Sequence, residues 1–157
     1  MRHVLVACLL VSCAKHRDDF HVAAKPGLAI AVCAAYVYDP KTTGAIVVEP
    51  NGKAGGLVAF RGTQFNVHRG DCLTIAHPTI HWSVDGARAF VGLGDDPAIG
   101  ARSARRMSQY DALYAGDELL EIPLYEAVMS ETLWLGATDR DLQRRLFERL
   151  TGSSPPP

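Results

Sequence analysis

Two histidines near the middle of the chain have the residue type and the spacing that could bind a metal ion. His77 and His81 flank a short segment that begins with Pro78. If the alternation of a strand continues through this proline, both imidazoles point to one side, and Asp71 or Asp85 could supply a third ligand for a divalent cation. The competing interpretation is that both histidines are hydrogen-bonded structural side chains. The metal cofactor therefore stays an open alternative.

His81 and its neighbour Trp82 are a second candidate site. Adjacent residues of a strand point to opposite faces, so only one of the two can line the interior. We expect His81 to face the interior, where a ligand or a water would bond its free ring nitrogen. Without such a partner, a buried ring nitrogen would cost about 1–3 kcal/mol. We expect Trp82 to pack beneath a following helical segment, with its indole N–H reaching a polar edge.

Alternating polar and apolar residues predict the strands that would hold these side chains. The expected strand pairs are 45–49 with 57–61, 64–68 with 71–75, and 79–84 with 87–93. Asn-Gly, Arg-Gly and Asp-Gly dipeptides lie between the members of these pairs and favour tight turns. Three consecutive hairpins predict an antiparallel meander. The Ala-rich run over 28–38 has no clear period and fits either a strand or a short buried helix.

Length and composition predict one domain over residues 1–157. A content of 48% hydrophobic and 21% charged residues excludes disordered and collagen-like chains. The predicted class is α+β, with an antiparallel β-barrel or sandwich, jelly-roll-like, in a β-rich part over 1–95. A C-terminal helical segment is expected over 97–150 and a disordered tail over 151–157.

The end of the chain has the clearest helical pattern. The segment Thr138-Asp139-Arg140-Asp141 predicts an N-cap, with a hydroxyl that can accept a backbone N–H and with acidic residues in the first turn. The apolar side chains that share one helix face are Leu142, Leu146, Phe147 and Leu150. This face must dock on the protein's own barrel or on a second subunit, and we expect a homo-oligomer held by the helical segment. The basic run over 102–106 could contact phosphates but is more typical of a solvated helix face, and 16 basic against 17 acidic residues favour no nucleic acid partner.

The window from His68 to Trp82 resembles the second conserved motif of the cupin superfamily. Gly70 and Asp71 match the turn that opens a strand in that motif. Ile75 matches its apolar anchor, and His81 matches the histidine that points into the barrel. The family's metal site also needs a His-x-His pair and a Glu or Gln upstream, and no such pair is present, so the resemblance implies a binding or regulatory barrel. The side chains expected around a bound small molecule are His81, Phe60, Phe65, Leu73, Trp82 and Phe90.

Three functions compete on this basis. The first is a non-catalytic, cupin-like module that binds a small molecule or regulates a partner. The second is a structural or interaction subunit of a larger assembly, and the third is a metal-dependent cupin-type enzyme that uses His77 and His81. An interior cavity of roughly a few hundred cubic ångströms would favour ligand binding, whereas a filled interior would favour the structural role.

The cysteines indicate the cellular compartment in which the protein is expected. Cys8, Cys13, Cys33 and Cys72 have no C-x-x-C or zinc-ligand spacing, and we expect buried free thiols, which are typical of a cytoplasmic protein. Alternatively, the segment Leu10-Val11-Ser12-Cys13 resembles the lipobox of bacterial lipoproteins and implies a lipid anchor on Cys13. The competing interpretation of this first apolar run is a buried strand. No run reaches the roughly 18 apolar residues of a membrane-spanning helix.

Overall fold

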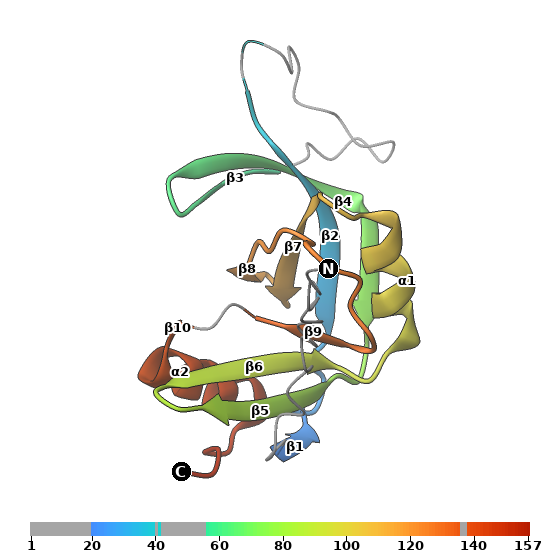
Figure 1. The fold of residues 1–157 in the computed structure, drawn as a ribbon. Helices are drawn as coiled ribbons and strands as arrows, with labels where there is room; N and C mark the ends of the chain where they lie inside the picture. The colour runs from blue at the N-terminus through green and yellow to red at the C-terminus, as the bar shows by residue number, and fades with distance from the viewer. Residues whose placement is uncertain (1–19, 40, 42–55, 136–137) are drawn as a thin grey trace, which may run out of the picture.

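The computed structural model describes residues 20–39, 41, 56–135 and 138–157 (Figure 1). The strands in chain order are β1 (Phe20–Ala23), β2 (Ile30–Val37), β3 (Gly56–Phe60), β4 (Thr63–Ile75), β5 (Thr79–Asp85), β6 (Arg88–Gly94), β7 (Tyr110–Ala115), β8 (Glu118–Glu121), β9 (Thr132–Trp134) and β10 (Thr138–Asp139). The helices are α1 (Pro97–Arg105) and α2 (Arg140–Thr151).

The strands form two antiparallel sheets. Sheet A has the order β1-β5-β6-β10, with β9 also paired to β6, and sheet B has the order β3-β4-β2-β7-β8. In Figure 1 strands β5 and β6 run across the direction of β2 and β7, with α1 beside β4 and α2 near the far end of β6. The predicted α+β class with sandwiched antiparallel sheets is confirmed, and the jelly-roll order stays a prediction.

The predicted hairpins have different outcomes. The β5–β6 hairpin is confirmed, and its turn residue Gly86 has a φ of +57°. The run over 28–38 is a strand, β2. The expected strand over 45–49 and its Asn-Gly turn lie outside the described residues. A turn that was not predicted joins β3 to β4, where Arg61 and Gly62 both have positive φ, as a two-residue hairpin turn requires.

The expected hairpin over 64–75 is wrong, because β4 is one strand of 13 residues. Cys72 pairs with Cys33 of β2, but the next residue of β2, Ala34, pairs with His68. Residues 69–71 therefore have no partner on β2, and they form a bulge instead of a turn. An odd number of extra residues reverses the alternation of side chains, so the two halves of β4 present their apolar residues to opposite faces of sheet B.

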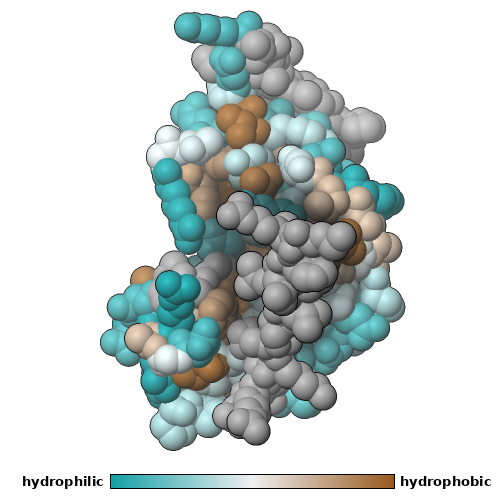
Figure 2. All heavy atoms as spheres, viewed as in Figure 1, coloured by the Kyte–Doolittle hydropathy of each residue, from teal (hydrophilic) through white to brown (hydrophobic). Residues whose placement is uncertain are grey.

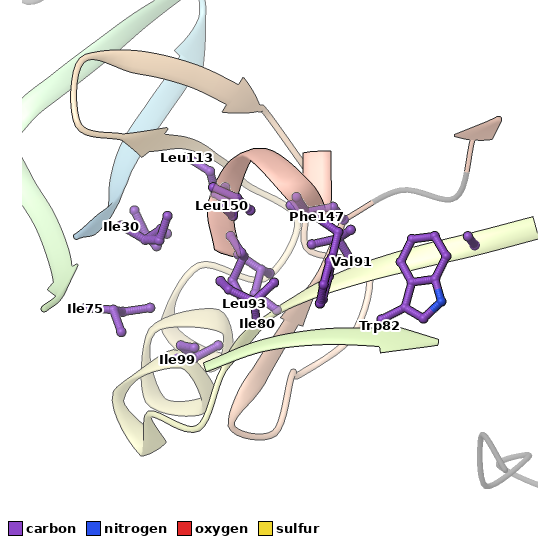
Figure 3. Packing of buried hydrophobic residues seen from close by; sticks show 14 of the residues in the cluster. Ile30, Ile75, Ile80, Trp82, Val91, Leu93, Ile99, Leu113, Phe147 and Leu150 are labelled. Carbon is purple, nitrogen blue, oxygen red and sulfur yellow. The ribbon is translucent and has the colours of Figure 1, made fainter. Parts of the chain in front are cut away.

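The apolar side chains accordingly form two clusters. The first cluster lies between the sheets and contains Ile30, Ile75, Trp82 and Leu113, together with Phe147 and Leu150 of α2 (Figure 3). The second cluster contains Cys33, Phe65, Val67 and Tyr114 of sheet B. Because β2 contributes Ile30 to one cluster and Cys33 to the other, sheet B carries packed side chains on both faces.

A disulfide joins Cys33 of β2 to Cys72 of β4 beside the bulge. The two cysteines are register partners, with their Cα atoms 4.0 Å apart. The expectation of free thiols is therefore wrong for this pair, and it no longer supports a reducing compartment. Cys8 and Cys13, with the lipobox and the first apolar run, lie outside the described residues.

The helical segment predicted over 97–150 is wrong in its middle, where β7, β8, β9 and β10 separate α1 from α2. The last helix is confirmed. Its N-cap Asp139 accepts hydrogen bonds from the backbone N–H groups of Asp141 (2.8 Å) and Leu142 (3.2 Å). Its apolar face docks within the same chain through Phe147 and Leu150. Neither helix in the described ranges has the length and apolar composition that crossing a bilayer requires.

The end of the chain does not form the loose tail that its composition predicts. Gly152 ends α2 with a φ of +79°, and its N–H donates to the Glu148 carbonyl at 2.7 Å. Beyond it, the Ser154 hydroxyl donates to the Glu148 carboxylate at 2.8 Å, and Pro155 is buried. The Ser154 contact therefore holds this residue against α2.

Candidate functional site

The six side chains expected around one interior ligand do not meet. Phe60 and Phe65 belong to the second cluster, whereas Leu73 and Trp82 belong to the first. Phe90 alternates along β6 with Ala89 and Val91, which are buried in the first cluster, so it faces away from that cluster. The bulge in β4 explains the division, because it sends Phe65 and Leu73 to opposite faces of sheet B.

His81 does not face the interior, contrary to the expectation. Its neighbours on β5, Ile80 and Trp82, are both buried in the first cluster, which leaves His81 on the outer face of sheet A. The position expected for Trp82 is confirmed, since its ring meets that of Phe147 in α2 edge-on at 5.8 Å. The expected polar partner is missing: within the described structure, the indole N–H donates no hydrogen bond.

On the outer face of sheet A, His81 belongs to a row of rings. Its ring centroid lies 5.5 Å from that of His21 and 5.9 Å from that of Trp134, and its Nε2 lies 3.1 Å from Asp95 Oδ1. Gly92 lies between His81 and Trp134, and a Cβ there would come within 3.0 Å of both side chains. The row is close-packed and leaves no room for a ligand beside Gly92.

The predicted metal ligands His77, His81 and Asp71 or Asp85 do not form a metal-binding site in the described structure. His77 is exposed between β4 and β5, and Asp71 is engaged by Arg102 at 3.0 Å. Asp85 is at the exposed end of β5. Among residues 20–39, 41, 56–135 and 138–157, no three His, Cys, Asp or Glu side chains are grouped so that they could hold a metal ion. The structure therefore does not bring His77, His81 and a third ligand together.

A buried ionic cluster ties α1 to β7 and to the bulge of β4. Asp111, which is fully buried, accepts two hydrogen bonds from Arg102 (2.6 and 3.0 Å) and one from the Tyr125 hydroxyl (2.9 Å). Arg106 forms an ion pair with the same carboxylate at 2.6 Å. Arg102 also donates to the side chain and the carbonyl of Asp71 in the bulge. The cluster thus fixes the bulge to the helix.

The protonation states in this cluster suit a structural role. Burial lowers the pKa of Arg102, but hydrogen bonds and charges from Asp111 and Asp71 outweigh this effect and raise it above its ordinary value. Burial and the neighbouring Asp111 raise the pKa of Tyr125 well above its ordinary value, so this hydroxyl stays a donor. The basic run over 102–106 is therefore not a solvated helix face, since Arg102 and Arg106 are buried beside acidic partners.

An open cleft of about 460 Å³ lies between α2 and β8, the strand at the end of sheet B. Figure 2 shows the surface hollowed between these two elements, at the left of the molecule. The lining residues are Leu120, Glu121, Leu142, Gln143, Arg145, Leu146 and Arg149. Those from α2 recur three and four positions apart, which places them on one face of the helix. The cleft combines an apolar floor with charged groups.

Ion pairs define the borders of this cleft. Arg149 of α2 contacts Glu118 of β8 at 2.6 Å and so links the helix to the strand. Glu121 is bound at 3.0 Å by Arg61 from the β3–β4 turn. In the described part of the chain, Arg145 is the lining cation that has no acidic partner.

Glu121 is the most desolvated charged group of the cleft, with only 12% of its side chain exposed. Burial raises the pKa of its carboxyl group, and Arg61 and the backbone N–H of Ile122 lower it only in part. The net direction is upward, so ionised Glu121 is less favourable in the folded protein than in the unfolded chain.

Replacing Glu121 with Gln is expected to raise the Tm at about pH 7. A folded-state pKa above the unfolded value means that stability is lost as pH rises through the folded pKa, and the amide removes this loss. The Tm difference between variant and wild type should shrink as pH falls below the ordinary carboxyl range. Thermal unfolding by circular dichroism across this pH range measures it. A difference that grows towards acidic pH would contradict the assignment.

Sequence reasoning found only part of this cleft. Leu142 and Leu146 appeared on the predicted apolar helix face, but that pattern assigns both to the core, whereas Leu142 is 52% exposed. Leu120 and Glu121 were missed because their segment was expected to be helical. The signal that could have found them is the Gly116-Asp117 pair before a short apolar run, which is typical of a hairpin turn.

No family model, curated protein or solved structure matches this chain. The cupin resemblance therefore stays a prediction.

Proposed function

We propose that the protein is a non-catalytic binding module whose small-molecule site is the cleft between β8 and α2. The observation that supports this proposal is the cleft itself, where three leucines and four polar side chains line about 460 Å³. Small-molecule sites are typically concave, mostly apolar and several hundred cubic ångströms in volume, with few polar groups. The binding role is the one that the cupin resemblance implies, at a different place in the fold.

The borders of the cleft favour a small ligand over a peptide. β8 is the edge strand of sheet B, and such an edge could pair with an added strand. The Arg149–Glu118 ion pair, however, joins β8 to α2 and closes one border of the cleft. A compact ligand fits beside this ion pair without breaking it.

The lining residues favour binding over catalysis. The described lining includes no serine, cysteine, histidine or lysine, which are the usual nucleophiles and bases. Its one carboxylate, Glu121, is already paired with Arg61. The polar groups present are suited to orienting a ligand.

A structural or interaction subunit is the second candidate. The observation that favours it is the packing of Phe65, Leu73 and Trp82 into two clusters in place of one ligand-lined interior. Association of copies through the helical segment belongs to this candidate. In α2, however, the most apolar contacts, those of Phe147 and Leu150, are made within one chain.

A thermal-shift screen with small organic metabolites tests the proposal. We expect at least one compound to raise the Tm of the wild-type protein by mass action. Leu142→Trp fills the cleft from an exposed position and should abolish the shift, whereas Val128→Trp, at an exposed apolar position outside the cleft, should preserve it. If no compound raises the Tm, or if Leu142→Trp responds like the wild type, the proposal is rejected and the structural role is favoured.

A further inference from the structure

The charges around the cleft indicate the class of ligand. We infer that the cleft takes a small organic anion, with an apolar body on the leucine floor and a carboxylate group held by Arg145. The inference rests on the proposed function, because it specifies the ligand of the same site.

The apolar body is inferred from the floor. Leu120 and Leu146 are half-buried and pack against the first cluster, so their positions are fixed by the core. Leu142 projects beside them and is 52% exposed. An apolar group placed on the three side chains would remove this surface from water, which stabilises a complex in proportion to the area covered.

The anionic group is inferred from the pairing of the charges. Arg149 already contacts Glu118 at 2.6 Å, and Glu121 is already bound by Arg61 at 3.0 Å. Arg145 is left as the lining cation with no acidic partner among the described residues. A ligand carboxylate would complete a pair with it, and a planar guanidinium matches a carboxylate through two parallel hydrogen bonds.

The same charges disfavour the other ligand classes. A cationic head group would have to compete with Arg61 for Glu121 and would lie near the unpaired Arg145. A phosphate ester would bring a second negative charge close to Glu118 and Glu121, and a single free guanidinium would not balance it. A monocarboxylate matches both the sign and the size of the free charge.

Three probes with the same apolar chain separate these classes: octanoate, 1-octanol and octylammonium. We expect octanoate to bind at least about tenfold more tightly than either of the others, as a charge-assisted hydrogen bond would give. Arg145→Gln should remove this advantage while leaving the affinity for 1-octanol unchanged. Arg144→Gln, the neighbouring arginine that does not line the cleft, should behave like the wild type. Dissociation constants come from titration calorimetry, with folding checked by circular dichroism.

The outcomes separate this inference from the proposed function. Equal or tighter binding of octylammonium, or an octanoate preference that survives Arg145→Gln, overturns the carboxylate inference. If Leu142→Trp still blocks the probes in that case, the cleft remains the binding site. If Leu142→Trp blocks the binding of none of the three probes, the inference fails. The metabolite screen then decides whether the proposed function fails with it.

Discussion

Replacing Asp111 with Ala is expected to destabilise the fold by about 3–5 kcal/mol, the usual cost of removing one partner from a buried ion pair. Asp111 is fully buried and is the shared partner of Arg102 and Arg106, whose side chains are 3% and 8% exposed. Without it, two buried guanidinium groups face each other with only Asp71 to balance them. Urea unfolding followed by tryptophan fluorescence measures the loss.

Two further variants provide reference values for this loss of stability. Tyr125→Phe removes one hydrogen bond to the Asp111 carboxylate and should cost about 1–3 kcal/mol. Asp117→Ala changes an exposed aspartate in the β7–β8 turn and should stay within about 0.5 kcal/mol of the wild type. An Asp111→Ala variant as stable as Asp117→Ala would show that the cluster does not hold α1 to the sheet.

Opening the Cys33–Cys72 disulfide is expected to cost about 4 kcal/mol, the loop-closure entropy for a sequence separation of 39 residues. The bond closes a loop that contains β3 and most of β4, so the reduced unfolded chain gains conformational freedom. Urea unfolding of the wild type with and without a reductant measures the loss.

The double variant Cys33→Ala/Cys72→Ala separates the disulfide from other effects of the reductant. Its urea midpoint should be close to that of the reduced wild type, and only slightly lower because the sulfur contacts are lost. A reductant should not lower the midpoint of this variant further. A wild-type midpoint that does not change on reduction would contradict the assigned pairing.

The elements that sequence predicted correctly have their determinants close together in the chain. The β5–β6 hairpin follows from an Asp-Gly pair between two alternating runs. Helix α2 follows from the N-cap Asp139 and from Gly152, whose left-handed conformation ends it. Such signals act over a few residues, and no distant contact in the described structure overrides them.

The bulge in β4 could not be predicted in this way. Arg69-Gly70-Asp71 has the residues of a turn, and the same three residues are compatible with either structure. Two distant contacts accompany the bulge: the pairing of Cys72 with Cys33 and the hydrogen bonds from Arg102 to Asp71. Because the bulge reverses the alternation of side chains, assigning these three residues to a turn also led to the wrong prediction of a ligand-lined interior.

Strand β7 was missed for a different reason. Its second residue, Asp111, is a charged residue in a buried strand, and it interrupts the apolar pattern of such a strand. The carboxylate is tolerated there because Arg102, Arg106 and Tyr125 surround it, and Arg102 comes from α1 and Arg106 from the residue that follows it. The cleft was missed together with β7, since β8 pairs with that strand.

The measurement that most directly tests the binding role is a titration of the isotope-labelled protein with octanoate, followed by amide chemical shifts. Saturable shifts are expected at the backbone of β8 (Glu118–Glu121) and along the cleft face of α2, and they should be absent in Leu142→Trp. Saturable shifts confined to the outer face of sheet A, around His81 and Trp134, or no saturable shifts with any metabolite of the screen, would contradict binding in the cleft.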